Sequence, residues 1–175
     1  MTDGDIETIQ AWLRQPHVQD WWKDPTAASR VAEEHRARQT GEDHTEMHVI
    51  VWRGSDIGMI QRYRLDDEPD FASAIAASGH TAADAAGIDY AIGAPDQIGH
   101  GIGTAVVAAF SADLFAAWPD IQEVVVTPQA ANRASCRVLE KAGYQWRWTG
   151  MIHSDDPSDA GPAALYVLAR HPGDR

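Results

Sequence analysis

The chain has 175 residues, of which 44% are hydrophobic and 23% charged, and this balance predicts a single soluble globular domain over residues 1–175. Its 26 acidic and 14 basic residues give a formal net charge of −12, which disfavours a nucleic acid as partner. Apolar runs end well short of the roughly 20 residues that a membrane-spanning helix needs, and the first residues lack the basic start of a signal peptide. We therefore expect a cytoplasmic protein with no membrane partner.

The first quarter of the chain is predicted to be helical. Apolar spacing predicts one helix over Ile6 to Leu13 and a second from Thr26 to about Gln39, with a tryptophan-rich loop between them. A sheet is expected to follow, with strands near Met47–Trp52, Ile57–Leu65, Gly87–Gly93, Glu123–Thr127, Tyr144–Ile152 and Ala164–Ala169.

Two connections between these strands have distinct compositions. Arg53-Gly54-Ser55-Asp56 is typical of a hairpin turn. The region from Glu68 to Ala86 is small, polar and rich in alanine, and it predicts a loop, with room for a helical turn.

A glycine-rich loop precedes a long apolar helix, and glycines alternate along it. It consists of Gln97, Ile98, Gly99, His100, Gly101, Ile102, Gly103 and Thr104. Such a loop lets backbone N–H groups approach an anion, which the helix N-terminus also favours. It lacks the Gly-Lys-Ser/Thr ending of a nucleotide triphosphate loop, and its spacing fits a dinucleotide fingerprint poorly. Taken alone, the loop is as well explained as a tight strand-to-helix turn.

A second motif follows about thirty residues later. A buried strand, Glu123 to Thr127, leads into a helix that Asn132 caps and Gly143 ends. Strand, glycine loop, helix, strand and Asn-capped helix, in this order, resemble the GNAT superfamily of acyl-coenzyme A N-acyltransferases.

The resemblance covers nearly the whole chain and is greatest for one branch, the aminoglycoside 6′-N-acetyltransferases. The segments that carry it are Ile9 to Trp22, Ile57 to Tyr63, Gly87 to Asp89 and Gln97 to Thr104. It implies an α/β (α+β) fold with a mixed, mostly antiparallel central sheet, splayed between the family's fourth and fifth strands and flanked by helices. Relatives have a first strand before the segment matched by Met1 to Asp5, and this sequence leaves no room for that strand.

The resemblance also implies acetyl-coenzyme A as co-substrate, with no metal. In the family, loop amides hold the pyrophosphate and the pantetheine arm lies between the splayed strands. Transferred to this sequence, the coenzyme site is Ala91, Ile92, Gln97, Ile98, Gly99, His100, Gly101, Ile102, Gly103, Thr104 and Asn132. His100 could add charge near phosphate when protonated, but a solvent-facing loop histidine is the favoured interpretation.

Acyl transfer to an amine needs the neutral amine, and a primary amine with a pKa of about 10 is mostly protonated at neutral pH. The resemblance places the family's proposed base at Asp89, with a strand amide near Ile92 facing the oxyanion. A carboxylate that only binds a cationic acceptor explains Asp89 equally well. Leu139 stands where many relatives have a proton-donating tyrosine, and Thr127 replaces a family carboxylate.

The acceptor is expected to be a cationic small molecule, in this branch the 6′-amine of an aminoglycoside. Candidate acceptor residues are Trp21, Trp22, Gln61, Tyr63, Asp84 and Asp89. The acidic clusters Asp66-Asp67-Glu68-Asp70 and Asp84-Asp89 flank the predicted acceptor side, whereas Asp155, Asp156 and Asp159 are expected in a solvated loop. The lone Cys136, inside a helix, is expected to be a packed thiol.

Two other functions remain open. The siderophore lysine N-acyltransferases share the Pro-His-Val opening found at Pro16 to Val18, but usually have His at the position of Asp89. A non-catalytic acyl-coenzyme A binding domain is the second, because Leu139 and Thr127 depart from the family pattern. The sequence leaves open whether the protein is a monomer or a homodimer.

Overall fold

The N-terminal helices form a layer of their own in the computed structural model, which describes residues 1–23, 26–76, 78–80, 83–152 and 156–171. The helical elements here are η1 (Asp3–Asp5), α1 (Ile6–Leu13), α2 (Pro16–Gln19) and α3 (Ala27–Thr40). The two predicted helices are confirmed, and α2 is a short addition inside the tryptophan-rich segment. Helix α3 ends at Gly41, whose φ of 78° is the left-handed conformation that glycine adopts without strain.

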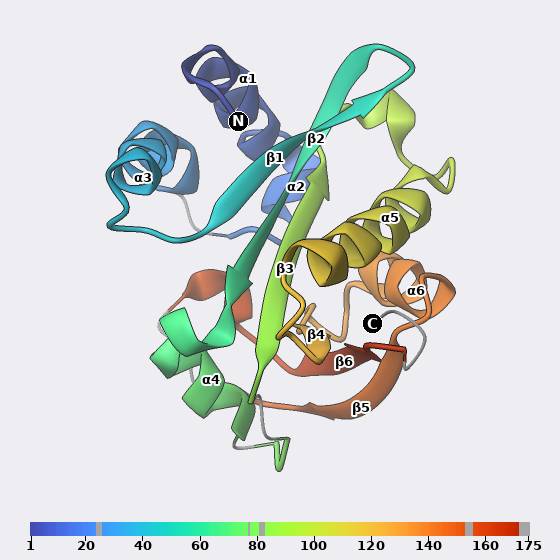
Figure 1. Cartoon of the computed structure of the whole chain (residues 1–175). Helices are drawn as coiled ribbons and strands as arrows, with labels where there is room; N and C mark the ends of the chain where they lie inside the picture. Colours follow the sequence, from blue (N-terminus) through green and yellow to red (C-terminus); the bar gives the residue numbers. More distant parts are fainter. Residues whose placement is uncertain (24–25, 77, 81–82, 153–155, 172–175) are drawn as a thin grey trace.

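The centre of the fold is a six-stranded sheet with strand order β1-β2-β3-β4-β6-β5 (Figure 1). The strands are β1 (Glu46–Trp52), β2 (Ser55–Arg64), β3 (Ala85–Ile92), β4 (Glu123–Val126), β5 (Gln145–Gly150) and β6 (Ala163–Ala169). All six predicted strands are thus present, with ends shifted by one or two residues.

The remaining helices follow the strands. They are η2 (Leu65–Asp67), α4 (Pro69–Ala76), η3 (Pro95–Gln97), α5 (Ile102–Ala117), α6 (Arg133–Lys141) and η4 (Pro157–Asp159). Helix α4 occupies part of the segment predicted as a loop with at most a helical turn. Its apolar residues Ala74 and Ile75 are buried, so burial against the sheet stabilises two full turns there.

The β1–β2 hairpin closes with a two-residue turn. Arg53 and Gly54 have φ values of 51° and 82°, and Trp52 pairs with Ser55 across them. Positive φ at both central residues defines the type I′ turn, whose twist matches that of the flanking strands. The predicted hairpin turn is confirmed.

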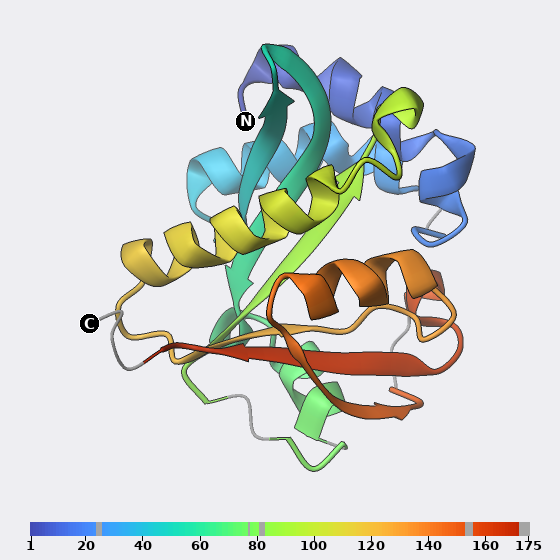
Figure 2. The same ribbon diagram turned by 90° about the vertical axis from the view of Figure 1, so that its right-hand side faces the viewer.

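Strands β3 and β4 are parallel and diverge almost at once. Their pairing runs from Ala85 with Glu123 to Gly87 with Val125, whereas the other strand pairs are antiparallel. Figure 2 shows the result, with β1 to β3 rising steeply away from the nearly horizontal β5 and β6. The fold class predicted from the family resemblance, a mixed sheet splayed at this point, is confirmed.

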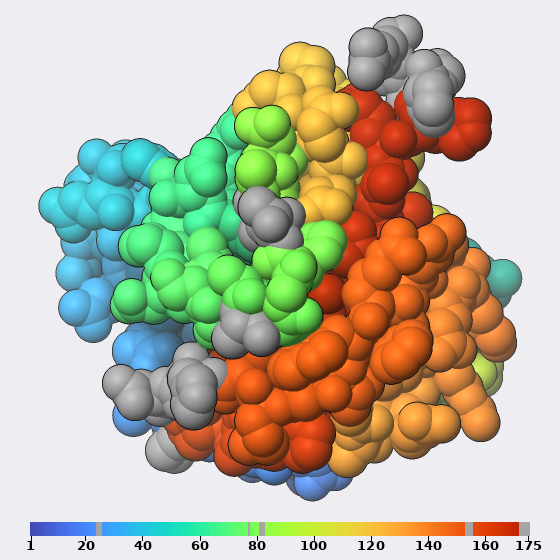
Figure 3. All heavy atoms as spheres, turned by 90° about the horizontal axis from the view of Figure 1, so that it is seen from below, coloured from blue at the N-terminus to red at the C-terminus, as the bar shows by residue number. Residues whose placement is uncertain are grey.

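Helices cover both faces of the splayed sheet. Helices α1 and α3 pack on β1 and β2 through one cluster that includes Ile9, Val31 and Met59. Helices α5 and α6 pack on the opposite face, over Ile88 and Val124. Helix α4 lies on the same face as α1 and α3 but further along, beside β5, as the view from below shows (Figure 3). The α1/α3 layer and α4 therefore leave space between them on one face.

The described residues bear on two further predictions, the missing first strand and the absence of a membrane-spanning helix. Residues 1–23, the described segment that precedes the sheet, contain helices and turns but no strand. Within the described ranges, no helix combines the length and apolar character needed to cross a membrane.

Leu139, on α6, is fully buried in the cluster between α5, α6 and the sheet. We expect Leu139→Ala to lower the free energy of unfolding by about 2–5 kcal/mol, because the substitution would leave a cavity that is enclosed by the core on all sides. Val51→Ala, on a strand residue that is 60% exposed, is the control and should change it by no more than about 0.5 kcal/mol. Urea titration of both variants measures this, and equal midpoints would contradict the core assignment of Leu139.

Candidate functional site

A cavity of about 480 Å³ opens where β3 leaves β4. Asp89 and Gln61 line it from the sheet face that carries α3, while Tyr90, Val126 and Ser135 line it from the face that carries α6. Because side chains of both faces share one cavity, the gap between the strands connects the two sides of the sheet. A volume of this size matches sites that enclose a drug-sized molecule.

Asp89 lies in the middle of β3, opposite Gln61 of β2. The Gln61 amide donates a hydrogen bond to Asp89 Oδ2 at 3.0 Å. Burial raises the pKa of Asp89, hydrogen bonds from Gln61 and Tyr63 oppose that rise, and the nearby carboxylates of Asp159 and Asp156 add to it. A carboxylate with a raised pKa is a stronger base than an exposed one, so Asp89 is suited to accept a proton.

Tyr63 lies over β3 because residue 87 has no side chain. A Cβ atom on Gly87 would stand 2.4 Å from the Tyr63 ring, well inside the van der Waals limit. Burial raises the pKa of Tyr63 well above its usual value, and the Asp89 carboxylate raises it further, so the phenol keeps its proton as a donor beside Asp89. A glycine inside a strand can signal such a close approach. From the sequence, Gly87 was predicted only to begin a strand.

Acidic residues dominate the acceptor side of the cavity. Its lining carries the guanidinium groups of Arg30 and Arg38 and the carboxylates of Glu34, Asp43, Glu68, Asp89, Asp156 and Asp159. Crowding has an electrostatic effect, because loss of solvent and the surrounding acids, Asp43 first among them, raise the pKa of Glu68. The lining therefore has a surplus of negative charge at neutral pH.

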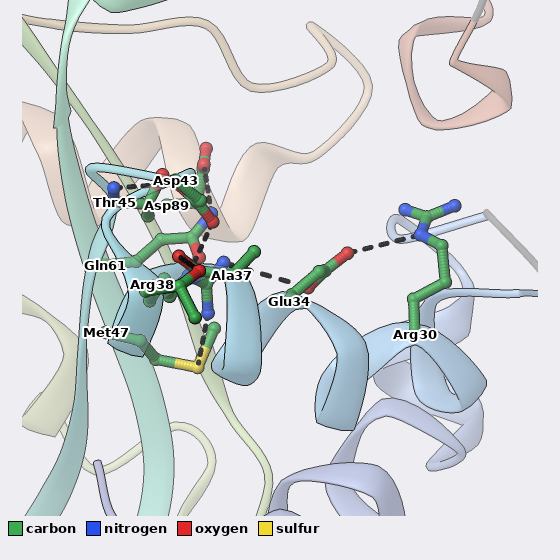
Figure 4. Close-up of polar contacts among 10 residues, drawn as sticks. Arg30, Glu34, Ala37, Arg38, Asp43, Thr45, Met47, Gln61 and Asp89 are labelled. Atoms are coloured by element: carbon green, nitrogen blue, oxygen red, sulfur yellow. Dashed lines mark hydrogen bonds and ion pairs between the residues drawn. The ribbon is translucent and has the colours of Figure 1, made fainter.

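Helix α3 supplies ordered ion pairs to this side (Figure 4). Arg38 Nε donates to Asp43 Oδ2 at 2.8 Å, its Nη2 lies 3.7 Å from Glu34, and Arg30 Nε reaches Glu34 at 3.2 Å. Burial raises the pKa of Asp43, but hydrogen bonds from Thr45 and Arg38 outweigh it and leave the pKa below its usual value. Asp43 is therefore a fixed anion held in place by Arg38.

The tryptophan pair predicted to wall the cleft does line the cavity. Trp21 and Trp22 follow α2, and Trp22 also packs on the core between α1 and α3. His17 of α2 has its Nε2 at 2.9 Å from the backbone oxygen of Ile92. This contact connects the segment that bears the tryptophans to the end of β3.

Backbone directions along β3 separate two predicted coenzyme residues. The N–H of Gly93 donates to Ile57 of β2, and the carbonyl of Ile92 turns the other way, towards His17. Alternation along a strand then directs the N–H groups of Ile92 and Tyr90 into the gap between β3 and β4. The N–H of Ala91 faces β2 instead, and the place of Ala91 in the coenzyme site stays a prediction.

The glycine loop forms the start of α5 and lies beyond the end of β3. Gly99 and Gly101 have φ values of 82° and 78°, and a Cβ added to either meets nothing within 4 Å. Helix α5 begins at Ile102, within the predicted glycine-rich segment, and Ile102 is a core residue. The first-turn N–H groups, which include those of Ile102, Gly103 and Thr104, precede the intrahelical hydrogen-bonding pattern and form a site for an anion.

The side chains of this loop provide fewer groups for binding an anion than its backbone does. Gln97 donates to its neighbour Asp96, and the exposed residues Ile98 and His100 extend outward. Gly103 sits against Val138 of α6, at 3.4 Å from the place of a Cβ, and so lets the two helices approach closely.

Helix α6 brings polar groups to the coenzyme side of the cavity. Asn132 caps the helix as predicted, with Oδ1 accepting from Ser135 N at 3.1 Å, and both residues line the cavity together with Thr127. Cys136 is buried, as expected for a packed thiol. Leu139 is enclosed in the core and is not part of the cavity lining.

The structure corrects the predicted placement of several acids. Asp84 is an exposed turn residue with φ of 53°, outside the cavity, so it does not join Asp89 in the acceptor site. Of the cluster at residues 66–70, Glu68 lines the cavity. Asp156 and Asp159 line it too, although we expected a solvated loop, because η4 brings them over β3; Asp155 lies outside the described residues.

Other residues were missed altogether by the sequence analysis. Glu34, Arg38 and Asp43 reach the site from α3 and the turn after it, and charged positions on a helix carry no sequence signal that separates a solvated face from a cavity wall. No group of three or more His, Cys, Asp or Glu side chains arranged for a metal ion occurs within the described parts of the chain.

Comparison with known proteins agrees with this geometry. The model of the acetyltransferase (GNAT) domain family matches residues 2–149. Aminoglycoside N(6′)-acetyltransferase type 1 of Klebsiella pneumoniae is 27% identical over 179 residues, an alignment that covers 100% of this chain and 83% of the relative. A lysine N-acyltransferase of Mycobacterium sp. (strain MCS) is 26% identical over 172 residues, covering 98% of this chain and 66% of the relative.

The fold has close counterparts among solved structures. Aminoglycoside acetyltransferase AAC(6′)-Ib in complex with coenzyme A and kanamycin superimposes with a TM-score of 0.78 and 25% sequence identity, covering 97% of this chain and 92% of that one. The family model spans most of the chain, and the fold as a whole superimposes on that of this enzyme. The chain therefore belongs to the GNAT family and is an N-acetyltransferase that uses acetyl-coenzyme A as co-substrate.

Proposed function

We propose that the protein transfers the acetyl group of acetyl-coenzyme A to a primary amine of a polycationic small molecule, the 6′-amine of an aminoglycoside, and so confers resistance. The observation that carries this proposal is the position of Asp89 among several carboxylates in a cavity that lies where β3 and β4 diverge. The relatives support the acceptor class, since the first of them is named for the 6′-amine. We further propose that residues 1–175 act as one cytoplasmic domain; the monomer and the homodimer both remain compatible with this site.

Coenzyme binding follows from the two ends of the gap. We place the pyrophosphate on the first-turn amides of α5, where backbone donors and the helix dipole favour an anion. We place the pantetheine arm along β3, where the N–H of Ile92 faces the gap and β4 no longer pairs. The thioester then lies beside Asp89, between the two faces of the sheet.

Asp89 acts as the general base in this arrangement. The acceptor arrives as an ammonium ion, because its pKa of about 10 lies above neutral pH. Asp89 takes a proton, directly or through water, and the freed amine attacks the thioester carbonyl. The N–H of Ile92, which faces the gap three residues after Asp89, donates a hydrogen bond to the oxyanion that forms on the thioester carbonyl.

The acidic wall selects the acceptor. A monoamine brings one positive charge to this wall, whereas a molecule with several ammonium groups can place a separate charge near each of Asp89, Glu68 and the η4 residue Asp159. Trp21 and Trp22 add apolar faces on which a sugar ring can stack.

An acceptor screen tests the proposed function. With acetyl-coenzyme A and the purified protein, thiol release should be rapid for an aminoglycoside with a 6′-amine and near background for the analogue with a 6′-hydroxyl. Lysine derivatives are the control acceptor, because the relatives include lysine N-acyltransferases. Turnover of lysine derivatives alone would show that the protein is a lysine N-acyltransferase instead. Coenzyme binding without turnover of any amine would favour a non-catalytic acyl-coenzyme A binding domain.

Gly101→Val tests the coenzyme loop. Valine at φ 78° is strained, so the first-turn amides should lose their alignment and acetyl-coenzyme A should bind about tenfold or more weakly. Gly41→Val is the matched control, because Gly41 also has φ of 78° with an open Cβ position but ends α3, away from the loop. Calorimetry of both variants measures the affinities, and equal values would remove the loop from the site.

Asp89→Asn tests the base. Turnover should fall by roughly 10²- to 10⁴-fold while coenzyme affinity is kept, and the rate of the variant should recover as the pH approaches the amine pKa. For the parent, the rate falls as the pH drops through the raised pKa of Asp89, since only the ionised carboxylate accepts a proton. Asp84→Asn, outside the cavity, is the control and should match the parent.

An Asp89→Asn variant that raises only the acceptor KM, with turnover and pH profile unchanged, would show that Asp89 binds the acceptor and that another group is the base.

A further inference from the structure

The departing sulfur of the coenzyme needs a partner, and the residue at position 139 cannot serve. Leu139 is enclosed in the core and carries no polar atom. Two hydroxyl groups nevertheless line the cavity on the α6 side, those of Tyr90 and Ser135. The proposed function assigns these two hydroxyl groups no role in the transfer.

The two hydroxyls form a pair across the gap. Tyr90 Oη lies 2.8 Å from Ser135 Oγ. Tyr90 follows Asp89 on β3 and therefore points to the opposite face of the sheet, towards α6. Ser135 lies in the first turn of α6, where the partial positive charge of the helix N-terminus favours a neighbouring anion.

The hydrogen count of the pair leaves one donor. Each hydroxyl carries one hydrogen, and their mutual bond uses only one of them. When Tyr90 Oη donates to Ser135 Oγ, the Ser135 hydroxyl retains its own hydrogen for a third group. In the opposite arrangement the Tyr90 hydrogen has only the backbone oxygen of Ser135 within reach, at a long 3.5 Å. A partly buried hydroxyl that lines a cavity can aim its remaining hydrogen at a ligand.

The other buried tyrosines are already committed elsewhere. Tyr144 shares a hydrogen bond with Ser111 at 2.7 Å, and Tyr166 donates to Glu140 at 2.9 Å. Neither tyrosine lines the cavity. Tyr63 does line it, but on the face of Asp89, where the amine enters.

We propose that the Tyr90–Ser135 pair donates a hydrogen bond to the coenzyme sulfur as the thiolate departs, and that it thereby takes the place of a donor at position 139. This inference rests on the proposed acetyl transfer. The amine that Asp89 has freed of one proton forms its bond to the carbonyl carbon, and the carbon–sulfur bond breaks with its electron pair going to sulfur. Asp89, after passing the first proton to water, takes the second proton from the nitrogen to give the neutral amide. The thiolate leaves as an anion and is later protonated by water, so no further reactant is needed.

The chemistry favours a hydrogen bond over a full proton transfer. Burial raises the pKa of Tyr90 to about 12, and the bond with Ser135 offsets part of this rise. A thiol of the cysteine type has a pKa of about 8.5, so the thiolate does not remove a proton from such a phenol. The pair therefore holds its hydrogen and stabilises the negative charge on sulfur.

Titration of bound coenzyme A provides a test that needs no acceptor. Thiolate absorbance in the complex should show a lower thiol pKa than that of free coenzyme A. Tyr90→Phe and Ser135→Ala should each move that pKa back towards the free value. Tyr144→Phe is the matched control, since it removes a buried phenol outside the cavity and should leave the titration unchanged. An unchanged titration in both Tyr90→Phe and Ser135→Ala, in variants that bind coenzyme A, would overturn the inference.

Kinetics add a second readout once an acceptor is known. Tyr90→Phe should lower kcat by about 10- to 100-fold, the usual effect of one hydrogen bond to a charged group. The loss should shrink with the acetyl ester of the selenium analogue of coenzyme A, because a selenolate leaves more readily without help. A raised KM for acetyl-coenzyme A with no change in kcat, and no difference between the two esters, would reduce the pair to a pantetheine contact.

The two readouts keep this inference separate from the proposed function. A parent protein that acetylates no aminoglycoside contradicts the acceptor proposal but leaves the thiol titration fully interpretable. A parent that acetylates well, with variants that titrate as the parent does, contradicts the inference alone.

Discussion

The structure depends on one geometric constraint, the divergence of β3 from β4 after three paired residues. Continued pairing would use the N–H groups of Tyr90 and Ile92 within the sheet and leave no room for a pantetheine arm. Divergence instead exposes those groups to a ligand and connects the two faces of the sheet. The base and the hydroxyl pair can then reach the same thioester from opposite sides, although Asp89 and Tyr90 are neighbours in the chain.

Electrostatic crowding is the second constraint, and it works against stability. Loss of solvent first, and repulsion between neighbouring carboxylates second, raise the pKa values of Asp89 and Glu68 in this cavity. Arg38 offsets part of this by pairing with Asp43 and Glu34. A cationic acceptor would compensate the remaining negative charge, so binding an acceptor should also stabilise the fold.

The sequence predicted the architecture well and the site unevenly. Strand alternation, the Arg53-Gly54 turn and the Asn132 cap are local signals, and local signals survive folding. Asp89 and the coenzyme role of the glycine loop were predicted through the family resemblance, which carries residue roles that local patterns alone do not. Ion pairs from α3 depend on how that helix docks against β2, and no periodicity in the sequence encodes docking.

The errors have the same physical origin. Asp84 lies five residues before Asp89, yet its turn places it outside the cavity, whereas the more distant Asp159 is brought back over β3 by η4. Distance along the chain is a poor guide to an acidic cluster in space.

The contact between Gly87 and Tyr63 has a consequence for how this cavity can change over evolution or in the laboratory. The tyrosine ring fills the volume in which residue 87 would carry a side chain, so the two positions share one space. A larger residue at 87 is compatible with the fold only if position 63 has first become smaller, and the order of the two substitutions matters. Variants selected for new acceptors should therefore acquire changes at 63 before 87, which makes this pair a point of epistasis next to the base.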